Sequence, residues 1–204
     1  MQSKGAILLI SGPSGAGKSS LVGELKKELD DIYFSVSVTT RKKREGEIDG
    51  INYHFVTKEE FEKDINDGVF LEWAKVHGNY YGTSLRHTLK AIEEGKLVLF
   101  DIDVQGFLQA EKRIGRLITS VFITTPTQEE LRRRLLKRGT DKLEDIEKRL
   151  SNAFEELKLA YEYDFFIVND DFEKAKKELL GIAIASRAKS STYNLEKFIT
   201  KWQS

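Results

Sequence analysis

A segment near the amino terminus has the residue types and spacing of a phosphate-binding loop. Gly12, Gly17, Lys18 and Ser19 occupy the fixed positions of the pattern G-x-x-x-x-G-K-[ST]. Glycine lets the backbone curl until successive N–H groups point at one anion, and a helix beginning near the lysine adds the positive end of its dipole. The lysine would reach the β- and γ-phosphates, and the serine hydroxyl would bind Mg²⁺. The segment therefore predicts binding of a nucleoside triphosphate.

The residues on either side favour this interpretation over an ordinary glycine turn. Residues 6–10 form an apolar run that is typical of a buried strand. Leu21, Leu25 and Leu29 recur every four residues, as on the buried face of a helix. A strand before the loop and a helix after it are the context that a phosphate-binding loop requires.

Two carboxylates follow another apolar run. Residues 97–100 predict a central parallel strand, and Asp101 and Asp103 come directly after it. Ligands bind at the carboxyl ends of the strands in open α/β sheets. We expect one acid to organise Mg²⁺ and its waters beside the loop, and the other to point along the same side of an extended chain. The alternative is a pair of solvated acids at a strand end.

Positive charge gathers in two segments. Residues 39–50 combine four cations with glycine and three acids. On sequence alone a solvated turn is as well supported as a binding site, and a nucleic-acid patch is less well supported because the acids cancel the charge. In residues 128–138, Arg134 and Arg138 carry like charges one turn apart, which favours an anion between them. The alternative is a solvated basic face. The cations expected to point largely outward here are Arg132, Arg133, Arg134, Lys137 and Arg138.

Composition restricts the class of protein. The chain has 204 residues, of which 40% are hydrophobic, which suits one globular unit with a real core. Lys and Arg together equal Asp and Glu at 33 each, so nucleotide affinity must come from local clusters of positive charge. The absence of cysteine excludes disulfides and cysteine zinc sites, and the three histidines lack metal-ligand spacing. We expect a cytoplasmic protein without a signal segment, a membrane span or a nucleic-acid partner.

Periodic runs predict the remaining elements. Strands are expected at 32–38, 52–56, 70–76, 120–124 and 165–168. Residues 78–84 suggest a turn. Helices are expected at 59–66, 85–94 and 128–138, then from a cap at Thr140 and Asp141 to Tyr161, and over much of 172–202. Thr57 and Glu60 form a capping box. The expected packed side chains include Leu89, Leu157, Tyr161, Leu195, Phe198 and Trp202.

Strands that alternate with helices after a phosphate-binding loop predict an α/β fold with a P-loop parallel sheet core flanked by helices. Two segments interrupt this plan, as in nucleoside monophosphate kinases. Residues 38–85 would form an inserted β-rich lobe that binds the nucleoside monophosphate, and residues 128–150 a helical arginine-rich lid. The core of this single domain would then be residues 1–37, 86–127 and 151–204.

Several blocks, in order along nearly the whole chain, resemble the guanylate kinase family. They are 12–20 (GPSGAGKSS), 37–47 (SVTTRKKREGE), 49–55 (DGINYHF), 70–74 (FLEWA), 78–83 (GNYYGT), 101–106 (DIDVQG), 138–140 (RGT) and 168–170 (VND). The resemblance implies an ATP-dependent nucleoside monophosphate kinase of purine metabolism. It would transfer a phosphoryl group reversibly from ATP to GMP with Mg²⁺ as cofactor, and would also accept dGMP.

The resemblance also implies the site residues. The ATP set is Gly12, Pro13, Ser14, Gly15, Ala16, Gly17, Lys18, Ser19, Ser20, Arg134, Arg138 and Asn169. The GMP phosphate would be held by Ser37, Arg41, Arg44, Tyr53 and Tyr81, and guanine by Glu72, Thr83 and Asp103. The catalytic set is Lys18, Arg41, Arg138 and Arg149. Mg²⁺ would be held by Ser19 and Asp101, partly through water.

These residue types suit the implied chemistry. Arginine forks bind phosphate bidentately. Guanine offers N1–H and N2–H₂ donors to carboxylates, whereas adenine presents an acceptor at N1, so two acids can discriminate on the order of a thousandfold. Phosphoryl transfer requires positioning and positive charge, so no strong base is needed.

Two other functions are less well supported. A non-catalytic guanylate-kinase-like module that binds phosphorylated proteins usually has a damaged phosphate loop, whereas Lys18 and Ser19 are intact. A kinase for another small phosphorylated acceptor would not need Glu72 and Asp103. A monomer and a homodimer are both compatible with the sequence.

Overall fold

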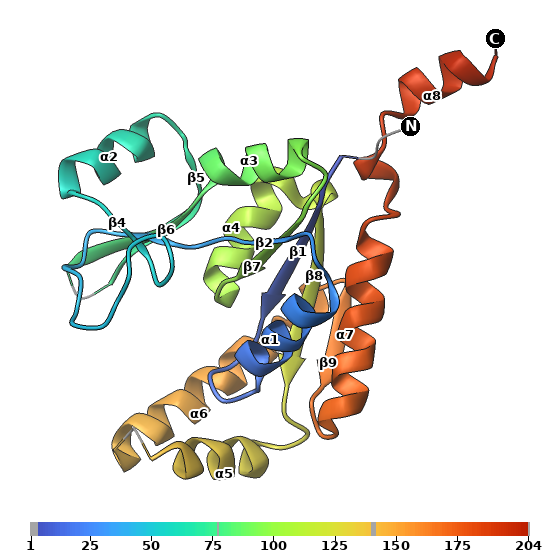
Figure 1. Cartoon of the computed structure of the whole chain (residues 1–204). Coiled ribbons are helices and arrows are strands. Elements are labelled where there is room, and N and C mark those ends of the chain that lie inside the picture. Colours follow the sequence, from blue (N-terminus) through green and yellow to red (C-terminus); the bar gives the residue numbers. More distant parts are fainter. Residues whose placement is uncertain (1–3, 77, 140–141, 204) are drawn as a thin grey trace.

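The fold is built on a parallel sheet whose central strand leads into the phosphate loop. The computed structural model describes residues 4–76, 78–139 and 142–203, apart from the side chain of His87. Five strands pair in parallel in the order β2-β7-β1-β8-β9 (Figure 1). They are β1 (Ala6–Ser11), β2 (Ile32–Phe34), β7 (Leu97–Asp101), β8 (Ile118–Thr124) and β9 (Phe165–Val168). The predicted α/β fold with a parallel core is confirmed.

Helices cover both faces of this sheet because its inner strands are apolar on both sides. Leu8 and Ile10 of β1 pack on the side of α1 (Lys18–Glu28) and α7 (Phe172–Ser186). Ile7 and Leu9 pack on the side of α3 (Leu85–Glu93) and α4 (Val104–Ile114). Successive side chains of a strand point to opposite faces, so a fully buried strand has a continuous apolar sequence.

A second sheet lies beside the core, in the order β4-β3-β6-β5. Its elements are β3 (Val38–Thr39), β4 (His54–Phe55), α2 (Lys58–Asn66), β5 (Phe70–Val76) and β6 (Asn79–Ser84). It has its own small core, in which the Phe61 ring stacks on Phe70 at 4.2 Å and on Tyr80 at 5.1 Å between ring centroids. The capping box of Thr57 and Glu60 is confirmed. Contacts between α4 and β5 join this sheet to the core.

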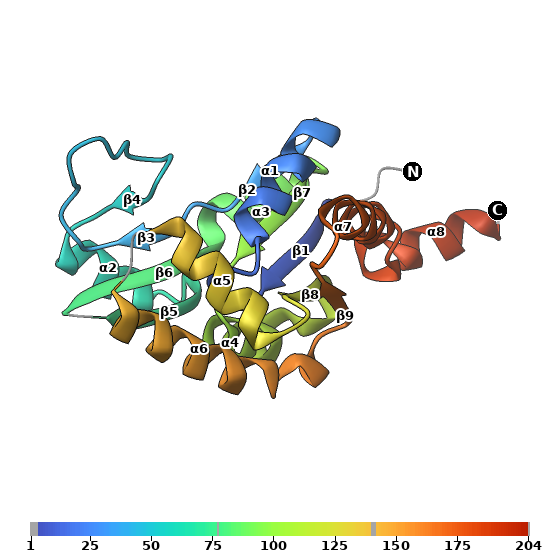
Figure 2. The same cartoon turned by 90° about the horizontal axis from the view of Figure 1, so that it is seen from below.

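A helical hairpin lies below the carboxyl ends of β1 and β8 (Figures 1 and 2). It consists of α5 (Gln128–Arg138) and α6 (Leu143–Leu157). Leu131 and Leu135 of α5 pack against Ile146, Leu150 and Ala153 of α6. Gly139 ends α5 with a positive φ of 67°, as predicted. The predicted caps Thr140 and Asp141 lie outside the described residues.

Two predicted elements are wrong. Residues 32–38 are not one strand, because β2 ends at Phe34 and β3 starts at Val38 in the other sheet. Residues 79–84 are strand β6 and not a turn, because they pair antiparallel with both β3 and β5. In both places pairing with other strands decides the structure: β6 pairs with β5, which directly precedes it, and with the distant β3.

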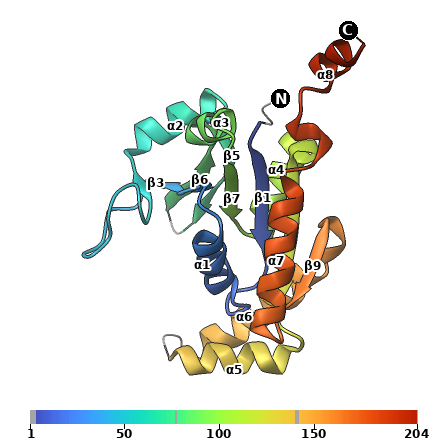
Figure 3. The same ribbon diagram turned by 45° about the vertical axis from the view of Figure 1, so that its right-hand side comes forward.

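Several side chains expected to be packed are exposed. Leu89 and Leu157 are exposed, and Tyr161 is 95% exposed because α6 ends before it and a short 3-10 turn, η2 (Ala160–Glu162), carries it outward. Leu195, Phe198 and Trp202 lie on α8 (Leu195–Trp202), which points away from the sheets (Figure 3). No helix in the described part of the chain is long and apolar enough to cross a membrane.

The separate cores predict local unfolding. We expect Phe61→Ala to speed amide hydrogen exchange in β3, β5 and β6 while the exchange of β1 and β8 stays unchanged. Removing the ring leaves a cavity that costs about 3–5 kcal/mol of stability, and this cavity lies only in the second core. Hydrogen exchange followed by mass spectrometry measures this. The control is Phe154→Ala, since that side chain is exposed on α6. Equal acceleration in β1 and β5 would show that the sheets unfold as one unit.

Candidate active site

The phosphate-binding loop has a backbone that only glycine allows at two positions. Gly12 and Gly17 have φ angles of 135° and 95°. A Cβ on Gly12 would lie 2.0 Å from the Ile123 carbonyl oxygen, and a Cβ on Gly17 would lie 2.3 Å from Asn169 Nδ2. Asn169 in turn donates to the Ala16 carbonyl at 2.7 Å. The loop is therefore held in shape by β8 and by the residue that follows β9.

Lys18 is the first residue of α1 and lies folded against its own loop. Its Nζ donates to the carbonyls of Gly12 and of Pro13, the latter at 3.0 Å. Burial lowers the pKa of Lys18, and the nearby charges of Asp101 and then Glu156 oppose this shift. Burial raises the pKa of Asp101, and Lys18 opposes that shift. Each of the two buried charges thus favours the ionised form of the other.

One cleft joins most of the predicted ATP residues. Its volume is about 600 Å³. It is lined by loop residues and by Lys18, Ser19, Ser20, Asp101, Ile102, Asp103, Arg134, Arg138 and Glu156. The strand-end acids, the loop and two arginines of α5 therefore surround the same space, as the sequence predicts. In parallel α/β sheets this is the usual place for a ligand.

The donor set in the cleft suits Mg²⁺. Ser19 and Asp101 contribute hydroxyl and carboxylate oxygens, which are ligands that Mg²⁺ prefers, and this ion usually keeps waters and substrate phosphates as its other ligands. Among the described residues, no group of three or more acids or histidines is placed to hold a metal ion without a substrate. These residues therefore fit an ion that is bound jointly with nucleotide phosphates.

The arginines of the hairpin contact the loop. The prediction that Arg134 points largely outward is wrong: its guanidinium donates to the Asn169 carbonyl at 2.8 Å, and its Nε pairs with Glu130 at 2.7 Å. Arg133 and Arg134 lower the pKa of Glu130 to about 2. Arg149 donates to Ser14 Oγ at 3.1 Å, whereas Arg138 is exposed at the cleft. The hairpin thus brings positive charge to both sides of the loop.

A second constellation lies at the first turn of α4. Glu72 of β5 accepts a hydrogen bond from Thr83 Oγ1 of β6 at 2.5 Å. Asp103 does not continue the strand as expected but caps α4, where its carboxylate accepts from the Gly106 N–H at 2.7 Å. Gly106 also makes room for Glu72, whose carboxyl atoms would lie 3.3 Å from a Cβ at that position.

Burial and charge act together on this pair of acids. Burial raises the pKa of Glu72, the neighbouring charge of Asp103 adds to the shift, and the hydrogen bond from Thr83 opposes it. Glu72 comes from the second sheet and Asp103 from the start of α4, and the contact between β5 and α4 brings them together.

The predicted monophosphate set gathers on the second sheet. Arg41 forms a bidentate ion pair with Glu47 at 2.6 and 3.1 Å, and its guanidinium lies 5.5 Å from the Tyr53 ring centroid. The rings of Tyr53 and Tyr81 meet edge to face at 5.9 Å. Glu47 also accepts from the Arg44 N–H at 2.7 Å. Arg41 lowers the pKa of Glu47, so this acid, which the sequence pattern marks only as one of three acids among residues 39–50, neutralises the arginine fork.

The two parts of the site are apart in this structure. Ser37 lies next to β4, where its carbonyl accepts from the His54 N–H at 2.8 Å. The residues of the described chain that line the cleft do not include Ser37, Arg41, Tyr53 or Tyr81. The fold therefore brings most of the triphosphate set together with Asp101 and Asp103, and holds the monophosphate set on a separate sheet.

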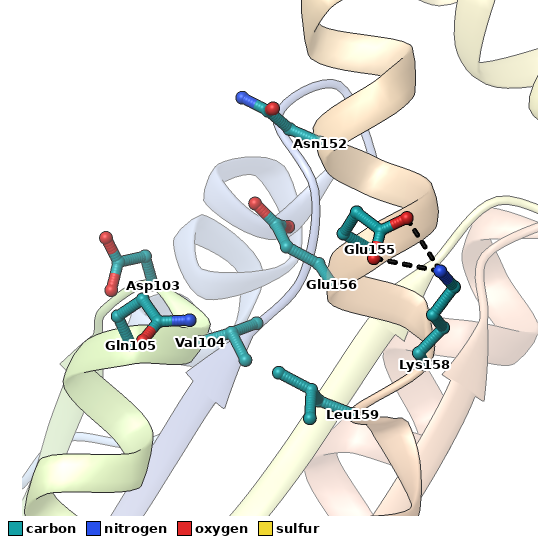
Figure 4. A pocket seen from close by; sticks show the side chains of 8 residues that line it. All are labelled: Asp103, Val104, Gln105, Asn152, Glu155, Glu156, Lys158 and Leu159. Atoms are coloured by element: carbon teal, nitrogen blue, oxygen red, sulfur yellow. Dashed lines mark hydrogen bonds and ion pairs between the residues drawn. The ribbon is translucent and has the colours of Figure 1, made fainter.

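Glu156 is a further acid that sequence reasoning missed. It lines the cleft and also a neighbouring pocket of about 510 Å³ between α4 and α6 (Figure 4). There it projects toward the side of Asp103, while Glu155 pairs with Lys158 (Figure 4). Burial raises the pKa of Glu156, and Lys18 opposes this shift. Glu156 lies one helical turn after Ala153, which is buried, so the periodicity of α6 could have placed this acid near the buried face.

Comparisons with known proteins identify relatives of this chain. The chain matches the family model described as guanylate kinase over residues 4–185. A guanylate kinase of Wolinella succinogenes is 54% identical over 203 residues, covering 100% of this chain and 94% of the relative. One from Campylobacter jejuni is 52% identical, covering 99% and 98%. The crystal structure of guanylate kinase from Anaplasma phagocytophilum has 32% identity and a TM-score of 0.73, covering 98% and 96%.

The loop geometry predicts the effect of one added methyl group. We expect Gly17→Ala to weaken Mg-ATP binding by roughly a hundredfold, because it strains a positive φ and displaces Asn169. Isothermal titration calorimetry measures the affinity. Gly23→Ala on α1 is the matched control, because a Cβ there meets nothing within 4 Å. Equal affinity in the two variants would show that the loop tolerates a side chain at position 17.

Proposed function

The chain belongs to the guanylate kinase family, and from this membership we propose how its side chains share the work of the reaction. It is an ATP-dependent nucleoside monophosphate kinase that transfers a phosphoryl group from ATP to GMP, giving ADP and GDP. The observation that carries this conclusion is the cleft in which the loop, Lys18, Asp101 and the α5 arginines meet. The nearly full-length match to curated guanylate kinases does not favour a non-catalytic binding module.

In our proposal the ATP phosphates lie on the loop. Lys18 exchanges the Gly12 and Pro13 carbonyls for the β- and γ-phosphates, while Asp101 and Glu156 keep its charge in the cleft. Arg138 and Arg149 stabilise the charge that develops on the transferring group. Asn169 acts by supporting the loop, since its side chain donates to Ala16. The rest of the ATP set is Gly12, Pro13, Ser14, Gly15, Ala16, Gly17, Ser19, Ser20 and Arg134.

We assign the two ends of GMP to different surfaces. The phosphate is bound by Arg41 and Arg44 together with the hydroxyls of Ser37, Tyr53 and Tyr81. Arg41 must then exchange Glu47 for the substrate phosphate, because Glu47 occupies both arms of its fork. Glu72, Thr83 and Asp103 read guanine. The proposed set includes no group for the 2′-hydroxyl, so dGMP is a proposed second acceptor.

Transfer requires the two nucleotides to approach each other. Reacting atoms must come within about 3–3.5 Å, whereas the monophosphate set does not line the ATP cleft in the described structure. We infer that residues 38–85 close toward the loop as one lobe and that residues 128–150 close as the lid, with the rest of the chain as the core. Closure also excludes water, which would otherwise accept the phosphoryl group.

Mg²⁺ is the proposed cofactor, which Ser19 and Asp101 would hold, partly through water. When bound, it would neutralise charge on the β- and γ-phosphates. The side chains supply the remaining requirements, which are the orientation of both phosphates by arginine and the retention of positive charge by Lys18.

A nucleotide panel tests the activity. We expect ADP formation with Mg-ATP to be about a hundredfold faster with GMP than with AMP, CMP or UMP, because two acids select guanine.

Lys18→Ala should lower kcat by about a thousandfold with an unchanged circular dichroism spectrum, since it removes a charge needed at the transition state. Lys27→Ala is the control, because Lys27 is exposed on the same helix. Turnover of Lys18→Ala near the wild-type rate would contradict the assignment.

The acidic pair predicts the selectivity and its pH dependence. Glu72→Gln with Asp103→Asn should reduce the GMP preference over AMP by roughly a hundredfold or more, because amides keep the packing and the helix cap but lose the charged acceptors.

The pKa of Glu72 is raised, so on acidification this side chain is protonated at a higher pH than an ordinary glutamate. The KM for GMP should therefore begin to rise at that higher pH.

This rise in the KM for GMP at low pH, the acid limb of the pH profile, should disappear in Glu72→Gln. The ionisation of the GMP phosphate itself affects the wild type and the variant alike. Glu173→Gln on α7 is the control for loss of one surface carboxylate. An unchanged GMP to AMP ratio, or the same acid limb in Glu72→Gln, would remove these acids from guanine recognition.

A further inference from the structure

The last helix has an apolar face that its own chain does not cover. Leu195, Phe198, Ile199 and Trp202 follow one another at helical spacing along α8 and are all exposed, Trp202 by 80%. None of the residues of α8 is buried. Isolated helices shorter than about 12–15 residues are marginal in water, so this helix of eight residues needs a partner surface. Figures 1 and 3 show it extending past the end of α7, away from both sheets.

A matching apolar surface lies on the same chain, between α7 and the edge strand β9. Two hollows of about 430 and 410 Å³ there share Phe165, Ile182 and Ala185 as lining residues, so they form one continuous groove. We call it the α7–β9 groove. Phe166 also lines it, and both phenylalanines are exposed. β9 is the last strand of the sheet, and an exposed apolar edge strand is a surface that proteins normally cover.

The connection to α8 keeps it out of its own groove. The groove runs along α7 as far as Lys189, and the chain then turns through the short 3-10 helix η3 (Ser190–Thr192). The Thr192 carbonyl accepts from the Lys4 N–H at 2.8 Å, and its side chain donates to the Arg187 carbonyl at 3.0 Å. These bonds hold Thr192, which lies three residues before α8, and from there the helix extends away from the body (Figure 1). The helix of a second copy can approach the groove from outside.

We propose that two copies of this chain form a symmetric dimer in which α8 of each copy lies in the α7–β9 groove of the other. The contact is self-complementary, because each chain supplies one apolar helix and one apolar groove. An aromatic side chain buries about 150–250 Å², so two helices and two grooves together bury on the order of 1,500 Å², the size of a stable interface.

The dimer leaves the catalytic cleft open. The groove and cleft have no lining residue in common within the described chain. The match to the guanylate kinase family model ends at residue 185, before α8 begins. The helix therefore lies outside the segment that the family model describes and outside the cleft, so loss of the dimer and loss of the activity can be measured separately.

Sedimentation equilibrium of the full chain tests the proposal with two paired variants. Phe198→Asp places a charge on the apolar face of α8, and Ala185→Glu blocks the groove at an exposed position of α7. We expect the wild type to have the mass of two chains and both variants the mass of one, with unchanged kcat. The matched controls are Thr200→Asp on α8 and Ile184→Glu on α7, which should remain dimeric. An equimolar mixture of the two variants keeps one intact helix and groove and should regain part of the dimer.

The fluorescence of Trp202 identifies what covers the helix. In a Trp73→Phe background Trp202 is the only tryptophan, and its emission should shift to the red on dilution, together with the change in mass. A monomer with red emission at all concentrations would overturn the proposal. So would a monomer with blue emission, which would mean that α8 folds onto its own chain, and so would a dimer insensitive to both variants, which would mean another interface.

Discussion

The strained backbone of the phosphate-binding loop is the constraint on which the rest of the site depends. Gly12 and Gly17 adopt positive φ angles, and neither position has room for a Cβ. The loop keeps this shape because β8 supports it from below and Asn169 holds the Ala16 carbonyl. Arg134 then contacts Asn169 in turn, so the hairpin is positioned relative to the loop and not only relative to the sheet.

Three of the cations assigned to phosphates have an acid beside them in this structure. Lys18 lies near Asp101 and Glu156, and Arg41 and Arg134 pair with Glu47 and Glu130. The acids prevent repulsion among closely spaced cations, which agrees with a chain whose formal net charge is zero. A nucleotide phosphate must therefore compete with a carboxylate at Arg41, and only a bidentate anion in the right place replaces both of its hydrogen bonds.

The arrangement of the hydrophobic cores suits a protein whose parts move. The second sheet and the helical hairpin have cores of their own, separate from those on the two faces of the parallel sheet. Such parts can shift as bodies without opening the main core. Glu72 from the second sheet and Asp103 at the start of α4 lie where the second sheet meets the core.

The sequence alone determined what local pattern encodes. The glycine spacing at 12–17, the apolar run before Asp101, the capping box at Thr57 and the terminal Gly139 each act within a few residues, so the loop, the central strands and most helices were predictable. Only the tertiary structure decided where residues 35–37 leave one sheet for the other, that residues 79–84 are a strand, and that Arg134 turns inward. It also revealed Glu47 and Glu156 as partners of cations and left α8 uncovered. Most of these outcomes depend on contacts between residues far apart in the chain, whereas Arg41 and Glu47 lie six residues apart in a loop that has no periodic pattern.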